Sequence, residues 1–265
     1  MIKVMKKLLG KPDSKNLFRE SIRSTDAFSV TYPKSGTTWM GFLIANIICR
    51  KSSVHLNLKN FIEIVPDVNQ LYFADQSLAR YNHLENPRVF MTHAPYDPSF
   101  PKVVYVLRDP RDVFVSYWHH KRLTDPNFDL SLRQFVMNDN HWPCSWNQHV
   151  DGWLLEGHAN VLTIRYEEMH ENAAQTLKKV AAFIPLQCDD AMIAKAVSDA
   201  KFDKMKKLEE EYGVDGAKGL SEERFIRRGK VGSWRDELDD ECLEILERKY
   251  GNSMKQLHYE PATFS

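Results

Sequence analysis

The sequence predicts a single α/β domain, residues 1–265, built on a central parallel β-sheet that is flanked by helices. Near-continuous apolar runs, typical of strands buried on both faces, alternate along the chain with helical segments. The 43% of apolar residues is enough for a sizeable core, and 265 residues suit one large domain better than two.

The expected strands and helices alternate in order along the chain. Short apolar runs rich in β-branched and aromatic residues predict strands at 27–32 (AFSVTY), 88–93 (RVFMTH), 102–108 (KVVYVLR) and 160–166 (NVLTIRY). Apolar residues at helical spacing predict helices at 40–50, 111–120, from 167 to about 183, and 237–251. We expect Gly251 to end the last helix, because glycine commonly terminates helices.

One segment, 206–225, differs in character from the rest of the chain. It is strongly charged and contains Gly213, Gly216 and Gly219. Such a composition predicts a mobile loop or lid, and a plain solvated connection is the alternative.

Charge and cysteine content narrow the partners and the compartment. Lys and Arg total 36, as do Asp and Glu, so the net charge gives no support for a nucleic-acid partner. None of the four cysteines forms a CxxC pair, which fits a reducing compartment. The chain shows neither the apolar segment of a signal peptide nor a run long enough to cross a bilayer. We therefore expect a cytoplasmic protein without nucleic-acid or membrane partners.

The stretch YPKSGTTW (32–39) lies between the first strand and an apolar helix, where parallel sheets bind ligands. Gly36 would let the backbone approach an anion closely, and amides that open a helix attract negative charge. Side chains add further donors: Lys34, Ser35, Thr37 and Thr38. A turn with ordinary polar capping residues would look the same. The lysine precedes the glycine, so the triphosphate motif GxxxxGK[ST] is not matched.

A second stretch, LRDPRDVFVSYWHH (107–120), offers further anion contacts. Arg108 ends a strand and Ser116 lies in the following helix, so both could reach one anion at the end of that strand. The charged residues between them could instead cap the helix and pair with each other: Asp109, Arg111 and Asp112.

The third stretch, FIRRGKVGSWR (225–235), places Arg227, Arg228 and Lys230 around Gly229. Arginine makes forked hydrogen bonds to phosphate, and a glycine among such residues exposes backbone amides. A solvated basic turn is the alternative for this stretch taken alone.

Together, in this order and spacing, the three stretches resemble the cytosolic sulfotransferases from about Tyr32 to Trp234. The first is similar to that family's loop for the 5′-phosphosulfate, the second to its 3′-phosphate strand and helix, and the third to its RKGxxGxW segment. The resemblance implies a P-loop-like sulfotransferase fold and the donor 3′-phosphoadenosine 5′-phosphosulfate (PAPS), with PAP as product. The two separated phosphate groups of PAPS would account for two separate anion sites.

The resemblance also implies a role for each donor-site residue. The 5′ end of PAPS would be held by Lys34, Ser35, Gly36, Thr37 and Thr38. The 3′-phosphate would be held by Arg108, Ser116, Arg227, Arg228 and Gly229. Trp39 and Phe202 would enclose the adenine, and Tyr166 would contact it, although Trp39 or Phe202 taken singly would be read as core packing.

A base is still needed to take the proton of the acceptor. His93 in MTHAP (91–95) ends a strand, and this stretch is similar to the family's KTHLP, so His93 is the expected general base. A lone histidine at such a position would more often be structural. Transfer would be in line, to a hydroxyl or amine of a small organic acceptor. Lys34 would stabilise charge on the leaving phosphate and Ser116 would restrain Lys34, with no metal required.

The sequence also departs from the family pattern, mostly on the acceptor side. Met91 replaces a usual lysine, Ala200 replaces a frequent hydroxyl, and the segment 93–102 is short. The family's KxxxTVxxxE dimer segment is absent, so the family's dimer cannot be assumed and the oligomeric state stays open. Expected acceptor walls are Phe28, Phe61, Tyr72, Phe73 and 149–153, although each of these could equally belong to the core. Acidic residues that could favour a cationic acceptor are Glu63, Asp75 and Asp151.

Two other functions remain open at this point. A nucleotide kinase could use a related sheet, and a non-catalytic protein could bind the nucleotide without turnover. Binding alone would need no base, so the presence of both Lys34 and His93 favours the enzyme.

Overall fold

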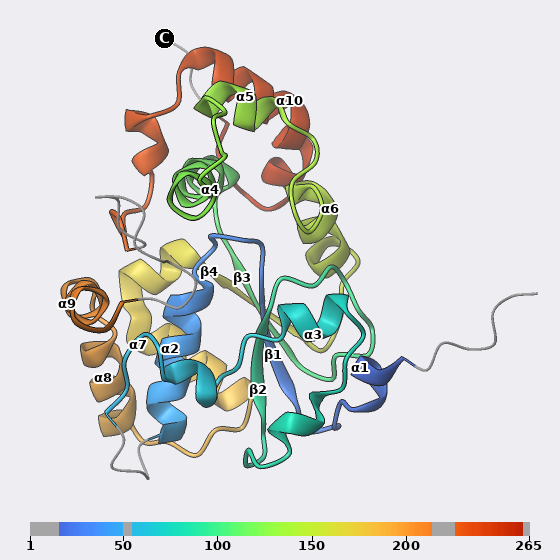
Figure 1. Ribbon diagram of the computed structural model, residues 1–265, viewed down its shortest axis with the longest axis vertical. Coiled ribbons are helices and arrows are strands. Elements are labelled where there is room, and N and C mark those ends of the chain that lie inside the picture. The colour runs from blue at the N-terminus through green and yellow to red at the C-terminus, as the bar shows by residue number, and fades with distance from the viewer. Residues whose placement is uncertain (1–15, 50–54, 214–225, 262–265) are drawn as a thin grey trace, which may run out of the picture.

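The computed structural model describes residues 16–49, 55–213 and 226–261 (Figure 1). Its sheet has four strands: β1 (Ala27–Thr31), β2 (Val89–Thr92), β3 (Val103–Leu107) and β4 (Val161–Arg165). They are all parallel, in the order β2-β1-β3-β4, which confirms the four predicted strands and the α/β class. Because Val30 of β1 is level with Thr92 of β2 and Tyr105 of β3, the carboxyl ends of these strands lie together.

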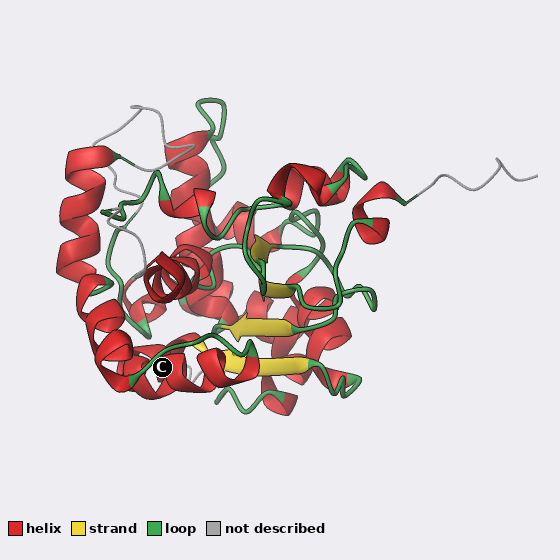
Figure 2. Cartoon of the chain, turned by 90° about the horizontal axis from the view of Figure 1, so that it is seen from below, coloured by secondary structure: helices red, strands yellow, loops and turns green. Residues whose placement is uncertain are grey.

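Helices cover both faces of the sheet (Figures 1 and 2). Helices α2 (Thr37–Ile48), α7 (Tyr166–Phe183) and α8 (Asp190–Asp199) pack against one another on one face. The other core contains side chains of α1 (Leu17–Glu20), α3 (Asn69–Phe73), α4 (Pro110–Thr124), α5 (Leu132–Met137), α6 (Trp146–Val150) and α10 (Asp240–Gln256). Helix α9 (Phe202–Tyr212) follows α8. No helix in the described ranges is both long and apolar enough to cross a membrane.

The unbroken apolar runs of the sequence have a direct structural cause. Successive side chains of a strand point to opposite faces, and here both faces are covered. In β3, Val104 and Val106 enter the core beside α2, whereas Tyr105 enters the core beside α10, and all three are fully buried. Every position of such a strand is therefore apolar.

Two predictions about segment ends were wrong. Helix α10 does not end at Gly251 but continues to Gln256, because Met254 beyond the glycine is still packed in the core. An interior glycine costs only about 1 kcal/mol, which such packing offsets. Residues 206–212, predicted as the start of a loop, belong to α9, whose Lys and Glu residues are good helix formers. The segment 214–225 lies outside the described residues.

Candidate active site

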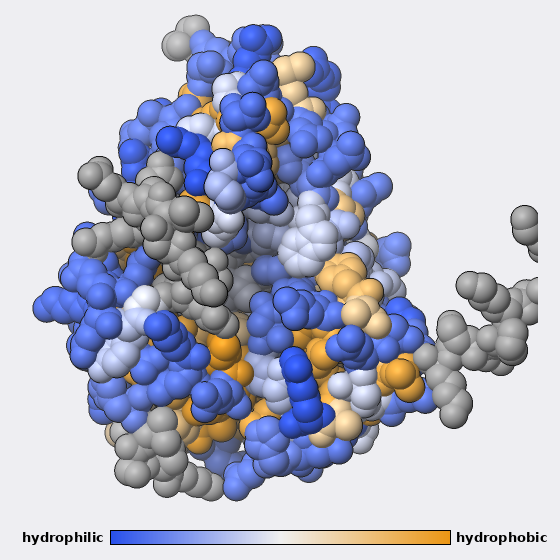
Figure 3. Space-filling view, in the orientation of Figure 1, coloured by the Kyte–Doolittle hydropathy of each residue, from blue (hydrophilic) through white to orange (hydrophobic). Residues whose placement is uncertain are grey.

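A cavity of about 580 Å³ opens where the strand ends face α4, α9 and the turn at 226–233. The space-filling surface is hollowed in this region (Figure 3). All but one of the predicted site residues line the cavity: Lys34, Gly36, Thr37, Thr38, Trp39, His93, Arg108, Ser116, Tyr166, Phe202, Arg227, Arg228 and Gly229. The exception is Ser35, which is buried and is not part of the cavity wall. Segments far apart in the sequence thus meet at one site.

The loop between β1 and α2 is shaped to receive an anion. Gly36 precedes the first turn of α2 with a φ of 108°, a conformation that glycine adopts readily. A Cβ at this position would lie 2.8 Å from the ring of Tyr166, so no side chain fits. Within the described part of the chain, no side chain caps this helix. Its first amides are therefore available to a bound anion.

Lys34 is the half-buried cation of this loop. Burial and the neighbouring charge of Arg108 lower the pKa of Lys34 to about 7, with a smaller contribution from Arg227 and an opposing one from Glu209. Burial and the neighbouring arginines thus disfavour the charged form of Lys34. A bound anion would restore the charged form of the lysine.

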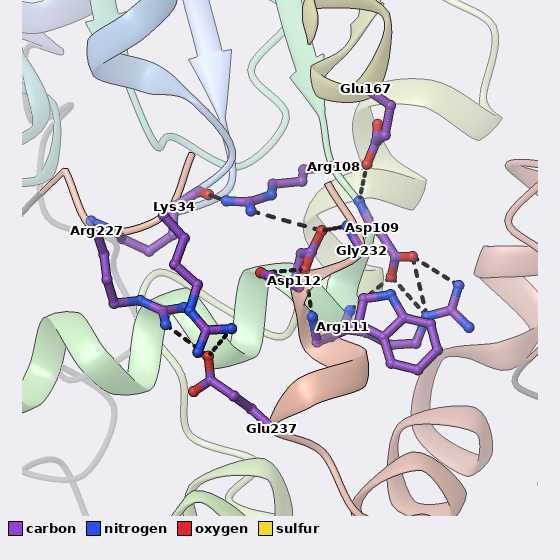
Figure 4. Close-up of polar contacts among 12 residues, drawn as sticks. Lys34, Arg108, Asp109, Arg111, Asp112, Glu167, Arg227, Gly232 and Glu237 are labelled. Carbon is purple, nitrogen blue, oxygen red and sulfur yellow. Dashed lines mark hydrogen bonds and ion pairs between the residues drawn. The ribbon is translucent and has the colours of Figure 1, made fainter. Parts of the chain in front are cut away.

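Arg108 and Asp112 join the loop to the basic turn (Figure 4). The Arg108 guanidinium lies 4.2 Å from the centre of the Tyr166 ring, and its Nη1 donates to the Lys34 carbonyl at 2.9 Å. The buried Asp112 carboxylate accepts the amide of Gly232 at 2.7 Å and that of Trp234 at 3.0 Å. The turn at 226–233 is therefore held against α4 beside Arg108.

The charged residues at the start of α4 were predicted to cap the helix and pair with each other. Asp109 does cap it, accepting the Arg111 amide at 2.9 Å, and its carboxylate pairs with the Arg111 side chain at 2.8 Å. For Asp112 this prediction was wrong: its carboxylate accepts hydrogen bonds from the backbone of the basic turn and from the Ser233 hydroxyl, and it lies 3.8 Å from Arg108 Nη2.

Two carboxylates hold the arginines of the basic turn. Arg227 pairs with Glu237 at 2.7 Å (Figure 4). Arg228 pairs with Asp236 at 3.0 Å. Glu237 also bonds His119 Nε2 at 2.6 Å. Burial alone would raise the pKa of Glu237, but the bonds from His119 and Arg227 hold it below its ordinary value. Glu237 therefore stays ionised and forms an ion pair with Arg227, the residue that was predicted to bind a phosphate.

Aromatic rings gather at the α9 end of the cavity. Trp39 Nε1 donates to the Ala200 carbonyl at 3.1 Å, and the Trp39 ring meets that of Tyr166 edge-on, with 5.7 Å between centroids. Gly229 has a φ of 56°, and a Cβ there would come within 2.2 Å of the Phe202 ring. The basic turn thus lies directly on Phe202. These rings offer flat surfaces suited to a planar base.

His93 directly follows the carboxyl end of β2. Its Nδ1 is 2.7 Å from the Thr31 carbonyl oxygen, which can only accept, so Nδ1 carries the proton. In the neutral ring Nε2 is then the basic nitrogen. Burial lowers the pKa of His93, and Lys34 lowers it further, although the bond to Thr31 and the charge of Asp67 act in the opposite direction. The histidine is thus neutral and able to accept a proton at neutral pH.

Comparison with known proteins assigns the family. Residues 24–258 match the model of the sulfotransferase domain. The chain belongs to the sulfotransferase family. Sulfotransferase 2B1 of Homo sapiens is 29% identical over 252 residues, which span 89% of this chain and 68% of that protein. The amine sulfotransferase of Oryctolagus cuniculus is 25% identical over 254 residues, spanning 88% of this chain and 82% of its own.

Solved structures show the same fold as this sulfotransferase. Retinol dehydratase in complex with androsterone and the inactive cofactor PAP has a TM-score of 0.73 at 23% identity, covering 91% of this chain and 83% of its own. Mouse sulfotransferase SULT7A1 complexed with PAP has a TM-score of 0.66 at 23% identity, covering 91% and 90%. The chain is therefore a PAPS-dependent enzyme that transfers a sulfuryl group to an acceptor, and the kinase and binding-only alternatives were wrong.

The acceptor side of the sulfotransferase differs from expectation. Of the predicted walls, Phe61 lines the cavity, whereas Phe28, Tyr72, Phe73 and residues 149–153 are not part of its lining. Phe28 belongs to the core, and Tyr72 packs on the Phe18 ring with 5.2 Å between centroids. For these two residues the alternative of core packing is the one that the structure supports. None of the three proposed acidic residues lines the cavity, namely Glu63, Asp75 and Asp151.

Several lining residues were missed from the sequence. They are Asp67, His120, Lys121, Thr124, Trp142 and His170. The spacing of Ser116, His120 and Thr124, four residues apart on one helix, could have indicated that α4 presents a polar stripe to the site. No comparable local signal marks Asp67 or Trp142. In the described ranges, no cluster of three His, Cys, Asp or Glu side chains is placed to hold a metal ion.

Proposed function

We propose that this sulfotransferase modifies a hydroxyl or amine of a small organic acceptor, with His93 as the general base and Lys34 stabilising the leaving phosphate. In this reaction the acceptor oxygen or nitrogen forms a bond to sulfur as the bond between sulfur and the 5′-phosphate oxygen breaks. The acceptor proton passes to His93 Nε2. The electron pair of the broken bond stays on the phosphate oxygen of PAP, close to Lys34.

The observation that carries this proposal is the fixed tautomer of His93. Its Nδ1–H is held by the Thr31 carbonyl at 2.7 Å, and Thr31 Oγ1 is 2.6 Å from Thr37 Oγ1 in the anion loop. The base and the loop are therefore oriented by the same residue of β1. A histidine with a purely structural role would not need to line the cavity that also contains Lys34.

The donor fits the rest of the cavity. The 5′-phosphosulfate would lie on the first amides of α2, beside Lys34. The 3′-phosphate would take Arg108, Arg227 and Arg228, and Gly229 would supply a backbone amide. The adenine would lie among the rings of Trp39, Tyr166 and Phe202, where the cavity is apolar and aromatic. Ser116 lines the cavity from α4 and would restrain Lys34.

The test compares His93→Gln with the matched control His83→Gln. His83 is exposed and is not part of the cavity wall. Because a general base contributes about 10²- to 10⁴-fold, we expect His93→Gln to lower kcat at least about 100-fold with labelled PAPS and a panel of phenols, alcohols and amines. Binding of PAP, measured by calorimetry, should stay within about twofold because the histidine acts on the acceptor. A kcat close to that of His83→Gln would show that His93 is not the base.

A further inference from the structure

Asp67 is the one carboxylate among the described residues that line the cavity. The cations of the same wall are six, namely Lys34, Arg108, Lys121, Arg227, Arg228 and Lys230. Four of these are assigned to the donor, which brings its own negative charge. A single acidic side chain in such a basic site is unexpected unless it meets a positive group.

The backbone around Asp67 is fixed beside the proposed base. The Met91 amide donates to the Pro66 carbonyl at 2.8 Å, and the Val68 amide donates to the Met91 carbonyl at 2.9 Å. Asp67 therefore pairs with β2 two residues before His93. The Asn69 side chain completes the link by accepting the His93 amide at 2.7 Å. Asp67 and His93 are thus held by one hydrogen-bonded unit.

The carboxylate of Asp67 makes few contacts with the other described residues. No Lys, Arg or His lies within ion-pair distance of it in the parts of the chain that the structure describes. Its Oδ1 accepts only the backbone amide of Asn69, at 2.8 Å. An exposed carboxylate with a fixed backbone can receive an ammonium group without first losing a partner.

An aromatic ring lies at the same end of the cavity. The Trp142 ring stands perpendicular to the His93 ring, with 5.5 Å between centroids, and is 43% exposed. The centroid of the Phe73 ring lies 5.3 Å from that of Trp142, and Phe73 is exposed to a similar degree. An aromatic face attracts cations and also packs on apolar rings. The walls near the base therefore combine an aromatic surface with one negative charge.

We propose that Asp67 binds the ammonium group of the acceptor, so that the preferred substrates are small aromatic amines that carry a hydroxyl group. This inference rests on the proposed function. The hydroxyl faces His93 and receives the sulfuryl group, while the ammonium stays protonated at Asp67. Met91, whose backbone pairs with that of Asp67, contributes an uncharged side chain to the same cavity wall.

The experiment measures sulfation of tyramine and of 4-propylphenol, which replaces the ammonium by a methyl group. For the unmodified enzyme we expect kcat/KM to be about two- to fivefold higher for tyramine, as for a partly exposed ion pair. Asp67→Asn should bring the ratio close to one. Glu63→Gln, which removes an exposed carboxylate outside the cavity, should leave the ratio unchanged. A ratio that is insensitive to Asp67→Asn overturns the inference.

Two further outcomes separate this inference from the proposed function. If PAP does not bind the unmodified enzyme in calorimetry, the proposed function fails. If PAP binds but neither phenol is sulfated, the same comparison is made as binding of the two compounds to the enzyme–PAP complex. Equal affinities for tyramine and 4-propylphenol would then overturn the role of Asp67, and a preference for tyramine that Asp67→Asn removes would support it.

Discussion

Replacing Gly229 by alanine is expected to weaken the binding of PAP without unfolding the protein. The φ of Gly229 is 56°, and the new Cβ would come within 2.2 Å of the Phe202 ring. Real side chains do not approach so closely, so the ring has to move away from the turn. If Phe202 packs on the adenine, the variant loses the surface on which the base lies.

The magnitude has two parts. Alanine in the left-handed region costs about 1–2 kcal/mol of folding stability, which lowers Tm by about 2–8 °C for a chain of this size. Loss of an aromatic surface under a base costs about 1–3 kcal/mol of binding free energy, which is about 5- to 150-fold in Kd. The first effect is measured by thermal unfolding and the second by calorimetry with PAP.

Gly157 supplies the matched control. Its φ is 72°, a Cβ there would meet nothing within 4 Å, and it is not part of the cavity wall. Gly157→Ala should therefore show the loss of stability alone, with the Kd for PAP unchanged. If Gly229→Ala also binds PAP within twofold of the unmodified enzyme, Phe202 does not contact the adenine and the assignment of this end of the cavity is wrong.

Three more predictions concern the charges of the donor site. Because the pKa of Lys34 is about 7 and a bound phosphate raises it, PAP affinity should fall as pH rises from about 7.5 to 9, and Lys34→Met should flatten this profile in calorimetry. In the unfolded chain Lys34 has its ordinary pKa of 10.5, so the unfolded state binds the proton more tightly than the folded state. The free energy of unfolding without ligand, measured in urea, should therefore rise with pH over the same range. A fall with pH would contradict the lowered pKa of Lys34. Glu237→Gln should lower the Kd for PAP about three- to tenfold, because Arg227 is released from its ion pair. Glu244→Gln on the exposed side of α10 is the control, and an equal Kd in the two variants would show that Glu237 does not compete with the phosphate.

The elements that the sequence predicts well are those whose physics is local. A strand buried on both faces is mostly apolar, and the run at 102–108 is apolar without a break, so it could be recognised without its neighbours. The loop around Gly36 combines a strand end, a glycine and a helix start within a few residues. Its anion-binding function follows from backbone geometry, which a short stretch of sequence determines.

The acceptor end could not be predicted, because it depends on how distant segments meet. Asp67 reaches the cavity only because Pro66 and Val68 pair with Met91 on β2. Trp142 enters from the segment between α5 and α6, far from every recognised motif. Neither residue belongs to a spacing pattern. From the sequence alone, Asp67 could therefore not be distinguished from the three acidic residues that were chosen instead.

The ion pairs of the basic turn have a consequence for how the donor is recognised. A phosphate gains less from Arg227 and Arg228 than from unpaired arginines, since Glu237 and Asp236 must first be displaced. A small anion that binds only at the basic turn would also have to displace these two carboxylates, but it would make fewer contacts with the protein. PAPS can offset it because the 5′ end binds the amides of α2 at the same time, and the two contacts are linked in one molecule. We infer that the acidic residues after the basic turn favour the intact nucleotide over free phosphate or sulfate. The selectivity then arises because the contacts of a phosphate with Arg227 and Arg228 are weakened.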